Sequence, residues 1–399
     1  MEISSPTARK LALGGQGLDG RWRVPAGKEG AIQVISRLGY VQIDTIAVVE
    51  RAHHHILWTR CPDYHPQMLH ELQTRDRRVF EYWWHAAAYL PMCDYRYALP
   101  RMRAHAESAR TREFLKTHKP LVKEVLARIR KEGPQGSSHF DAPSGKKRGS
   151  WWDWKPAKRV LETLFSSGTL MVAGRENFQR LYDLTERVLP PDVDTKEPTR
   201  EEWIRYLLRR ILAGQGISSL KYWWMRDKKA LAFGLSDLIQ SGEVTTVSIA
   251  ADEGGPLYAL TKAVAAAERA ASVPEQVHIL SPFDGLVIWR NELRRVFDFE
   301  YRLECYYPES RREFGYFCLP ILWGDQFIGR IDAKADREAG VLLVRKVVFE
   351  HNKSLRQALP LLADKLHAFA AFNGCNRLVI ESVVPPRVLP ELREKAKKK

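Results

Sequence analysis

The stretch AKRVLETLFSSGTLMVAGRENFQRLYDL, residues 157–184, decides the fold of this sequence. Its apolar residues have helical spacing over 157–166, and Gly168 then favours the end of that helix. Alternating apolar and polar residues at 169–173 and 178–184 predict two short strands joined by a turn. A helix followed at once by a β-hairpin is typical of a winged helix.

The same order of elements returns further along the chain. Thr199 and Glu202 have the spacing of a capping box and open a predicted helix over 200–212. The elements predicted after it are helices over 218–226 and 230–241 and strands over 244–250 and 257–260. We therefore predict at least two winged helices, near 133–190 and 198–262, and a less clear third at the N-terminus.

The rest of the chain adds helices before these modules and strands after them. Helices are predicted over 25–38, 66–79 and 100–131, and the Gly-, Pro-, Ser- and Lys-rich stretch 133–149 is typical of an exposed connection. The C-terminal part is β-rich, with strands predicted over 287–289, 295–299, 317–322 and 341–349, a helix over 354–373 and a last strand over 377–382. The predicted fold class is α+β.

Length and charge limit the function. A chain of 399 residues is expected to form two to four units, and its net charge of +15 favours a polyanionic partner, with nucleic acid first. No stretch approaches 18 uninterrupted apolar residues, and the start MEISSPTARK lacks the apolar segment of a signal peptide. We expect a cytoplasmic, nucleoid-associated protein.

The cysteines give no sign of a metal or disulfide framework. Their positions, Cys61, Cys93, Cys305, Cys318 and Cys375, include no CxxC pair and no Cys/His cluster with zinc-ligand spacing. A Walker A pattern is absent as well. We expect no metal and no cofactor.

One short segment carries candidate catalytic residues. In an extended segment, Val41 and Ile43 face the core while Gln42 and Asp44 project together from the opposite face. A carboxylate beside an amide suits hydrolysis, because the carboxylate can accept a proton from water or stabilise a cationic sugar. The alternative is a polar strand face or a helix cap.

Two neighbouring segments are candidates for DNA contacts. Arg51, the adjacent His53, His54 and His55, and Arg60 suit phosphate or minor-groove contacts better than a metal site, because no local third ligand has regular spacing. The aromatic run at 80–89 is mostly core, but exposed members such as Trp84, together with His85, can contact bases.

A further motif, Ser281-Pro282-Phe283-Asp284, precedes Arg290, which we also place among the DNA-binding candidates. A Ser/Asp pair can indicate nucleophilic catalysis, but no GxSxG elbow accompanies it. The competing interpretation is a turn in which Asp284 accepts hydrogen bonds from backbone amides.

Taken together, these segments resemble the YcaQ/AlkZ family of bacterial crosslink-repair DNA glycosylases. The resemblance rests on the following segments: LGYVQIDTI at 38–46, RAHHHILWTR at 51–60, FEYW at 80–83, HAAAYLP at 85–91 and SPFD at 281–284. Similar length and domain order extend it over nearly the whole chain. Gln42-Ile43-Asp44 matches the Gln-apolar-Asp motif of the YcaQ branch and lacks the second Gln of the AlkZ branch.

The resemblance implies a fold, an activity and roles. It implies three tandem winged helices and a C-terminal β-rich domain with a closing helix. The expected domains are 1–132, with the Gln-Ile-Asp motif, 133–197, 198–275 and 276–399. It implies a monofunctional DNA glycosylase that hydrolyses the N-glycosidic bond of N7-alkylated purines and unhooks interstrand crosslinks. Asp44 is then the principal catalytic residue, with Gln42 assisting, and His53, His55 and His85 are candidates to line the site.

The expected partner is double-stranded DNA with alkylated or crosslinked bases, bound by a monomer. The alternative is a non-enzymatic winged-helix regulator, because winged helices most often serve that role and a fold alone does not establish catalysis. A nuclease is disfavoured, because no cluster of acidic metal ligands stands out. Asp44→Asn separates the first two: a regulator keeps its function, whereas a glycosylase loses turnover and keeps DNA binding.

Overall fold

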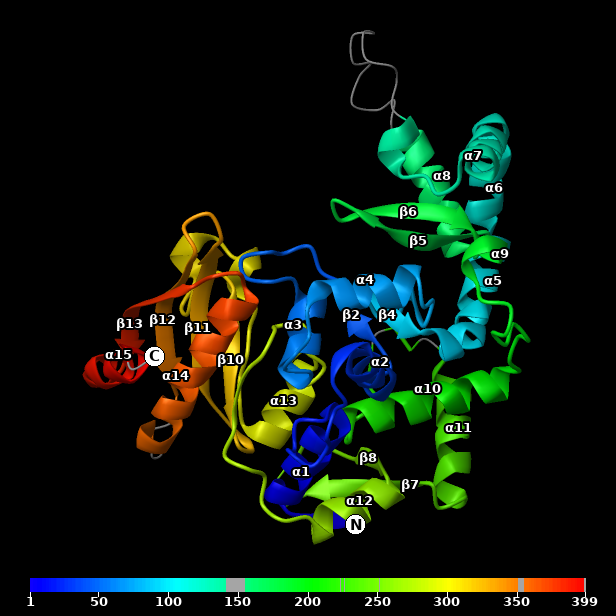
Figure 1. Cartoon of the computed structure of the whole chain (residues 1–399). Coiled ribbons are helices and arrows are strands. Elements are labelled where there is room, and N and C mark those ends of the chain that lie inside the picture. Colours follow the sequence, from blue (N-terminus) through cyan, green and yellow to red (C-terminus); the bar gives the residue numbers. More distant parts are fainter. Residues whose placement is uncertain (141–154, 223, 226, 251, 351–354, 398–399) are drawn as a thin grey trace. The chain divides into compact units, whose positions relative to one another are not determined.

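A computed structural model describes residues 1–140, 155–222, 224–225, 227–250, 252–350 and 355–397 (Figure 1). The chain divides into two compact units, one of residues 1–65 and 204–399 and one of residues 66–203. This division joins the start of the chain to its C-terminal half, so it differs from the four consecutive domains expected from the sequence. We call them the discontinuous unit and the central unit.

The central unit consists of two helix-and-hairpin groups and the helices between them. Its elements are α4 (Pro66–Thr74), β3 (Val79–Trp83), β4 (Ala87–Pro91), η1 (Met92–Ala98), α5 (Leu99–Glu107), α6 (Ala109–Thr117), α7 (Lys119–Glu132), η2 (Ser137–Phe140), α8 (Lys155–Ser166), β5 (Leu170–Glu176), β6 (Gln179–Leu184) and α9 (Thr185–Val188). Helix α8 followed by the antiparallel β5–β6 hairpin confirms the predicted order, and α4 followed by β3–β4 repeats it.

The single helix predicted over 100–131 is wrong, because three helices occupy that stretch. Ser108 has an extended backbone (φ −61°, ψ 138°) and accepts a hydrogen bond from the Thr111 amide, so it is the N-cap of α6. Pro120 stands in the first turn of α7, where a proline favours a new helix start. Of the predicted connection over 133–149, the part from residue 141 onward lies outside the described residues.

The discontinuous unit contains two sheets. Its elements are β1 (Glu2–Ile3), α1 (Ser5–Gln16), α2 (Gly27–Leu38), β2 (Val41–Gln42), α3 (Ala52–Arg60), α10 (Arg200–Gln215), α11 (Lys228–Gln240), β7 (Val244–Ile249), β8 (Leu257–Leu260), α12 (Thr261–Arg269), β9 (Val277–Ile279), α13 (Arg290–Phe297), η3 (Glu304–Tyr306), η4 (Glu309–Arg311), β10 (Cys318–Trp323), β11 (Gln326–Asp336), β12 (Val341–Phe349), α14 (Leu355–Phe372), β13 (Arg377–Val384), η5 (Pro386–Val388) and α15 (Leu389–Lys397). The first residues of α10 belong to the central unit.

The smaller sheet belongs to the second predicted winged helix. Strands β7 and β8 pair antiparallel after α11, as predicted, and β1 adds a parallel third strand beside β7. The capping box at the start of α10 is confirmed, because the Thr199 amide lies 2.8 Å from the Glu202 carboxylate and the Glu202 amide lies 3.2 Å from the Thr199 hydroxyl. The helix considered over 218–226 is absent from its described residues, and Leu220 has a left-handed backbone (φ 55°) that interrupts it.

The larger sheet has the order β13-β12-β11-β10-β9 and supports the C-terminal half of the chain. All its neighbouring strands are antiparallel except β12 and β13, which run parallel and are connected through α14 (Figure 1). The expectations for β10, β12, α14 and β13 are confirmed. The strands predicted over 287–289 and 295–299 are wrong: helix α13 covers much of that stretch, because Leu293, Val296 and Phe297 have helical spacing and are buried.

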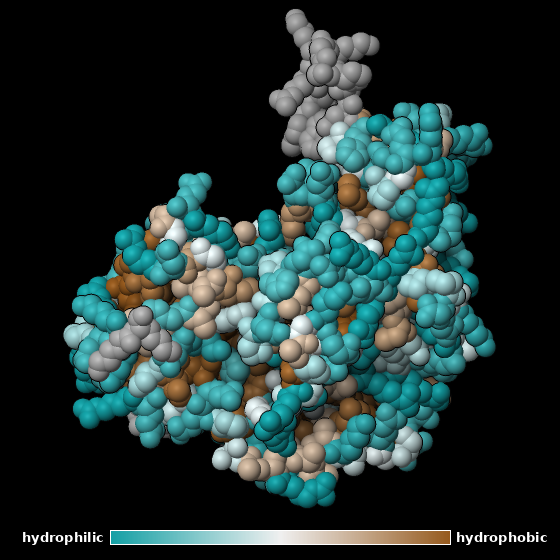
Figure 2. All heavy atoms as spheres, viewed as in Figure 1, coloured by the Kyte–Doolittle hydropathy of each residue, from teal (hydrophilic) through white to brown (hydrophobic). Residues whose placement is uncertain are grey.

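Hydrophilic residues cover most of the face that Figure 2 shows. No helix among the described residues is long and apolar enough to cross a lipid bilayer. The fold is α+β with a C-terminal sheet, as expected.

Candidate active site

A turn and a short strand after α2 set the backbone position of Asp44. Helix α2 ends at Leu38, and Gly39 takes the left-handed conformation (φ 79°) that turns the chain. A side chain at Gly39 would also press against the Arg210 side chain, because a Cβ placed there lies 3.0 Å from Arg210 Cδ. Strand β2 follows at once, and Asp44 lies two residues beyond its end.

The Asp44 carboxylate is half-buried and held by its own loop. Its Oδ1 accepts a hydrogen bond of 2.8 Å from the Ile46 amide. Burial raises the pKa of the Asp44 carboxyl, while hydrogen bonds from the Ile46 and Thr45 amides oppose that rise without cancelling it. A carboxylate with a raised pKa is a stronger proton acceptor than an ordinary aspartate, as a general base requires.

The loop beyond Asp44 is fastened to the C-terminal half of the same unit. The Ala335 amide of β11 donates to the Val48 carbonyl at 2.9 Å. The Glu50 amide donates to Asn373 Oδ1 at 2.7 Å, and Asn373 is fully buried beyond the end of α14. These bonds come from residues 287 and 323 positions away in the chain, so β11 and the residue that follows α14 fix the backbone beyond Asp44.

Gln42 does not share an exposed face with Asp44. Val41, Gln42 and Ile43 are all buried, and β2 ends at Gln42, so the strand alternation does not continue to Asp44. The expectation of two polar side chains projecting together is therefore wrong in this detail. Gln42 is instead a buried amide two residues before the carboxylate.

The three adjacent histidines lie on α3, where His53 and His55 are buried and His54 is partly exposed. His54 Nδ1 lies 2.7 Å from the Tyr64 hydroxyl, and His55 Nε2 lies 2.9 Å from the Ile279 carbonyl. Burial lowers the pKa of His54 to about 3 and that of His55 to about 4, so both rings are neutral at neutral pH. His53 is buried beside His54, with ring centroids 4.2 Å apart.

Arg60 is bonded entirely within the protein. Its side chain is fully buried and forms a two-pronged ion pair with Asp284, at 2.7 Å and 3.0 Å. It also donates to the Gln16 carbonyl and side chain. The predicted DNA contact of Arg60 is wrong, because every direction in which its guanidinium can donate is used inside the protein.

The Ser281–Asp284 motif is a turn, as the competing interpretation predicted. Asp284 Oδ1 accepts the Leu286 amide at 3.0 Å while both its oxygens bind Arg60. Arg290 is directed inward as well: it donates to the Pro282 and Val287 carbonyls, and its guanidinium lies over the Tyr301 ring. His55 and Arg290 therefore have internal partners in place of the expected DNA contacts.

The aromatic candidates of the central unit differ in exposure. Trp84 is buried, and burial lowers the pKa of His85 to about 4. The neighbouring Trp83 is 37% exposed, so it is the tryptophan of this pair that is open to a ligand. Arg51, which precedes α3, is half-buried.

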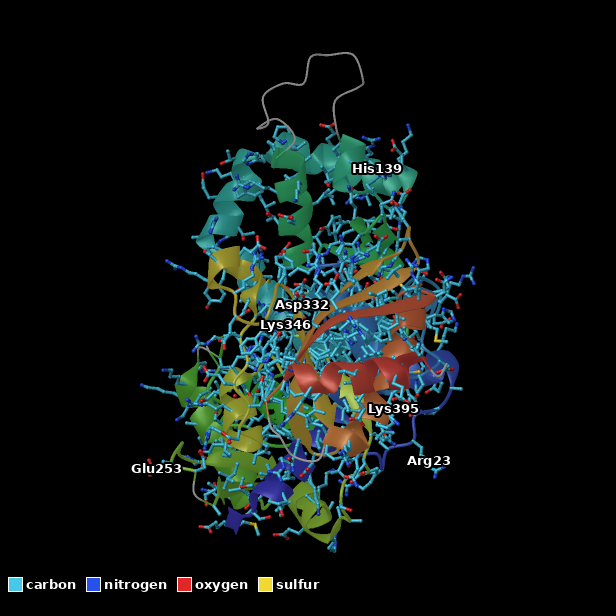
Figure 3. All side chains as sticks on the ribbon, turned by 90° about the vertical axis from the view of Figure 1, so that its left-hand side faces the viewer. Arg23, His139, Glu253, Asp332, Lys346 and Lys395 are labelled. Carbon is cyan, nitrogen blue, oxygen red and sulfur yellow. The ribbon has the colours of Figure 1, made fainter. Side chains whose placement is uncertain are left out.

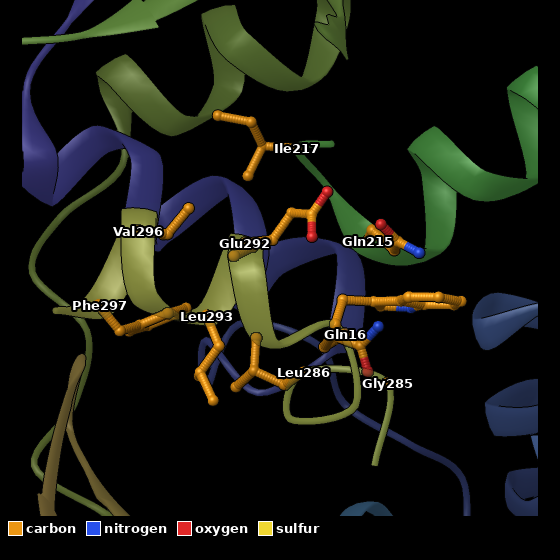
Figure 4. Close-up of a pocket in the computed structure, with 11 residues that line it drawn as sticks. Gln16, Gln215, Ile217, Gly285, Leu286, Glu292, Leu293, Val296 and Phe297 are labelled. Carbon is orange, nitrogen blue, oxygen red and sulfur yellow. The ribbon is translucent and has the colours of Figure 1, made fainter. Parts of the chain in front are cut away.

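The cavity in Figure 4 is too small for a base. It is about 20 Å³ in volume, which is room for about one water molecule, and Gln16, Gln215 and Glu292 lie among its lining residues. Asp44 is not among them. Over the described part of the chain, no three His, Cys, Asp or Glu side chains are grouped as ligands of one metal ion.

Two residues near the site were missed by the sequence analysis. Tyr306 and Tyr307 in and after η3 are 75% and 45% exposed. The signal in the sequence was an aromatic pair followed by Pro308 and the charged run to Arg312, which is unusual for a core strand.

Two comparisons relate the chain to known proteins. A family model described as "DNA glycosylase AlkZ-like" matches residues 35–372, which include Asp44, α3 and most of the large sheet. The solved structure of Streptomyces sahachiroi DNA glycosylase AlkZ is similar in fold, with a TM-score of 0.64 and 16% sequence identity over 96% of this chain and 100% of that one.

Proposed function

Because this chain belongs to the AlkZ-like DNA glycosylase family, we propose that it excises N7-alkylated purines from duplex DNA and unhooks interstrand crosslinks formed through such bases. Family membership makes the chain a DNA glycosylase that acts in DNA repair, and it removes the alternative of a non-enzymatic regulator. The lesion, the catalytic residues and a monomeric state are our proposals.

The chemistry of the lesion explains why one carboxylate is enough. Alkylation at N7 gives the purine a positive charge, so the base departs with the electron pair of its bond to C1′ and becomes neutral. No acid is needed to protonate this leaving group, whereas ordinary glycosidases use a second carboxyl for that step. The requirement that remains is to stabilise the cationic sugar and to supply water.

Asp44 is suited to both tasks. Its negative charge stabilises the oxocarbenium-like sugar as the C1′–N9 bond breaks. Water then forms the new bond to C1′ and transfers a proton to the Asp44 carboxylate, which passes it to solvent. The product is an abasic site. The DNA strand remains uncut, because no amine of the protein attacks the sugar. Gln42, two residues away, assists by orienting the loop or the water.

The remaining candidates become proposed contacts with the DNA. Arg51, His53, His54, Trp84 and His85 stay in this set as proposals; Arg51, His54 and His85 are partly exposed, whereas His53 and Trp84 are buried. A base tethered to the opposite strand cannot rotate freely into a closed pocket. The half-exposed position of Asp44, which does not line the small cavity, therefore supports attack on a base that stays near the duplex.

The observation that carries the proposal is the half-buried Asp44 carboxylate, with its raised pKa, on a backbone fixed by the large sheet. The test uses two duplexes, one with a single N7-methylguanine and one with a nitrogen-mustard guanine–guanine crosslink, each incubated with the wild-type protein and EDTA. Alkali-labile sites in both duplexes and release of the crosslinked strands are expected. Cleavage of the first duplex alone would restrict the function to monoadducts, and an inert protein that binds both would overturn the proposal.

The raised pKa of Asp44 predicts an acid limit to the reaction. The carboxylate is the active form, so the single-turnover rate is full at neutral pH and falls as pH drops through the Asp44 pKa, above the usual range of an aspartate. A rate profile from pH 4 to 8 on N7-methylguanine duplex, with DNA binding measured at each pH, checks this. A rate that stays flat down to the ordinary aspartate pKa would contradict it.

A further inference from the structure

An exposed aromatic pair lies in the segment between α13 and β10. Tyr306 is 75% exposed and Tyr307 is 45% exposed, while the tyrosine that precedes them, Tyr301, is buried and donates its hydroxyl to the Cys318 carbonyl at 2.6 Å. Single exposed aromatics are ordinary on protein surfaces. Two in succession, followed by the exposed Arg311, form a surface that suits a base and its phosphate.

The backbone that carries this pair is closed by hydrogen bonds to a buried carboxylate. Glu304 is buried, and its carboxylate accepts hydrogen bonds from the amides of Glu313 at 3.2 Å, Phe314 at 2.9 Å and Gly315 at 3.1 Å. These bonds close the segment from Glu304 to Gly315 into a loop. A ligand that stacks on Tyr306 therefore meets a surface already in place and loses little affinity to ordering of the loop.

The closed loop is held against the large sheet. Asp332 on β11 and Lys346 on β12 are paired in register, and both lie beside the loop (Figure 3). Lys346 Nζ donates to the Glu313 carbonyl at 3.1 Å. Gly315 rests on Asp332 so closely that an added Cβ would lie 2.4 Å from its carboxylate. The loop therefore contacts β11 at Asp332.

The loop that carries Asp44 meets the same strand. The Val48 carbonyl is bound by Ala335, three residues beyond Asp332 and hence about 10 Å along β11. The two loops also influence each other electrostatically. Burial, and after it the Asp44 carboxylate, raises the pKa of the Cys305 thiol, and Asp44 contributes in the same direction at Tyr306, after burial and Cys305. The loop of Tyr306 and the loop of Asp44 therefore meet the same strand, β11, close enough for Asp44 to act electrostatically on Tyr306.

We propose that Tyr306 stacks on a nucleobase next to the alkylated nucleotide and so determines how the duplex is seated over Asp44. The proposal rests on the proposed function for its substrate. It explains why a large aromatic ring is left in water on a hydrogen-bonded loop that meets the same strand as the Asp44 loop. An aromatic ring stacks on any base, so the contact positions the DNA without reading its sequence.

The experiment compares Tyr306→Ala, Tyr306→Phe and Phe233→Ala. Phe233 on α11 is 69% exposed and is the matched control for loss of a surface aromatic ring. The first measurement is the dissociation constant for a duplex with one N7-methylguanine as its non-hydrolysable 2′-fluoro nucleoside. Loss of one stacked base weakens binding about tenfold. We expect this for Tyr306→Ala, near wild-type binding for Tyr306→Phe, and no change for Phe233→Ala.

The second measurement shows the contact itself. A 5-iodouracil beside the lesion is irradiated in the complex, and the adduct is located by peptide mapping. An adduct at Tyr306 that Tyr306→Ala abolishes and Tyr306→Phe retains supports the proposal. Wild-type binding by Tyr306→Ala, or a Tyr306→Phe variant as weak as Tyr306→Ala, overturns it.

Failure of this inference is distinguishable from failure of the proposed function. Neither measurement requires turnover, so both decide the role of Tyr306 even if the wild-type protein releases no alkylated base. Conversely, normal base release by wild type together with an unaltered Tyr306→Ala variant would remove the stacking contact and leave the proposed function standing.

Discussion

Asp44→Asn is expected to slow base release by about 10²- to 10⁴-fold and to leave DNA binding almost unchanged, because the amide can neither accept a proton nor offset the positive charge of the sugar. The asparagine keeps an oxygen where Oδ1 accepts the Ile46 amide, so the loop conformation survives the change. The measurement is the single-turnover rate on N7-methylguanine duplex, with the dissociation constant measured on the same preparation.

Asp63→Asn is the matched control for Asp44→Asn. Asp63 belongs to the same unit and also accepts a backbone hydrogen bond, from the Gly27 amide at 2.6 Å, but it is exposed. We expect this variant to release the base at the wild-type rate. A similar loss of rate in both variants, or an Asp44→Asn variant that keeps most of its activity, would remove Asp44 from the catalytic role.

The sequence predicted those elements whose signals are local. Helix α8 and the hairpin β5–β6 follow one another directly, so the helical spacing, Gly168 and the alternating strands all lie within one short stretch. The pairing of β1 with β7 joins residues about 245 positions apart, and no pattern in the two segments specifies that partner. Helix α13 was misread for another reason: its short apolar runs also fit strands.

The residues of the candidate site also differ in whether their signals are local in the sequence. Asp44 was found because a short motif carries it, whereas the roles of Arg60 and His55 depend on distant partners. An arginine in a basic protein suggests a phosphate contact, and only the structure shows that Asp284, 224 residues away, takes up its charge. Tyr306 was missed because exposure, which makes it a candidate, is a property of the folded loop.

The buried ion pair between Arg60 and Asp284 is expected to contribute strongly to the stability of the fold. Arg60→Met and Asp284→Asn are each expected to lower the free energy of unfolding by about 3–5 kcal/mol, because each leaves a charge in the interior without its partner. The pair joins α3 to the turn at 281–284, and both side chains are fully buried. The measurement is chemical denaturation of each variant beside the wild type. It gives the transition midpoint and the dependence of the free energy of unfolding on denaturant concentration.

Two controls test whether the loss of stability comes from the buried ion pair itself: the double variant, and a variant of an exposed ion pair. Arg60→Met combined with Asp284→Asn removes both charges, so its loss is expected to be smaller than the sum of the two single losses. Arg302 and Glu300 form an ion pair at 2.8 Å with both side chains about 70% exposed, and Arg302→Ala is expected to change stability by less than about 1 kcal/mol. Additive single losses would mean that Arg60 and Asp284 act through their other hydrogen bonds. In that case α3, with its histidines, would be held in place by the contacts of Arg60 with Gln16 instead of by the ion pair.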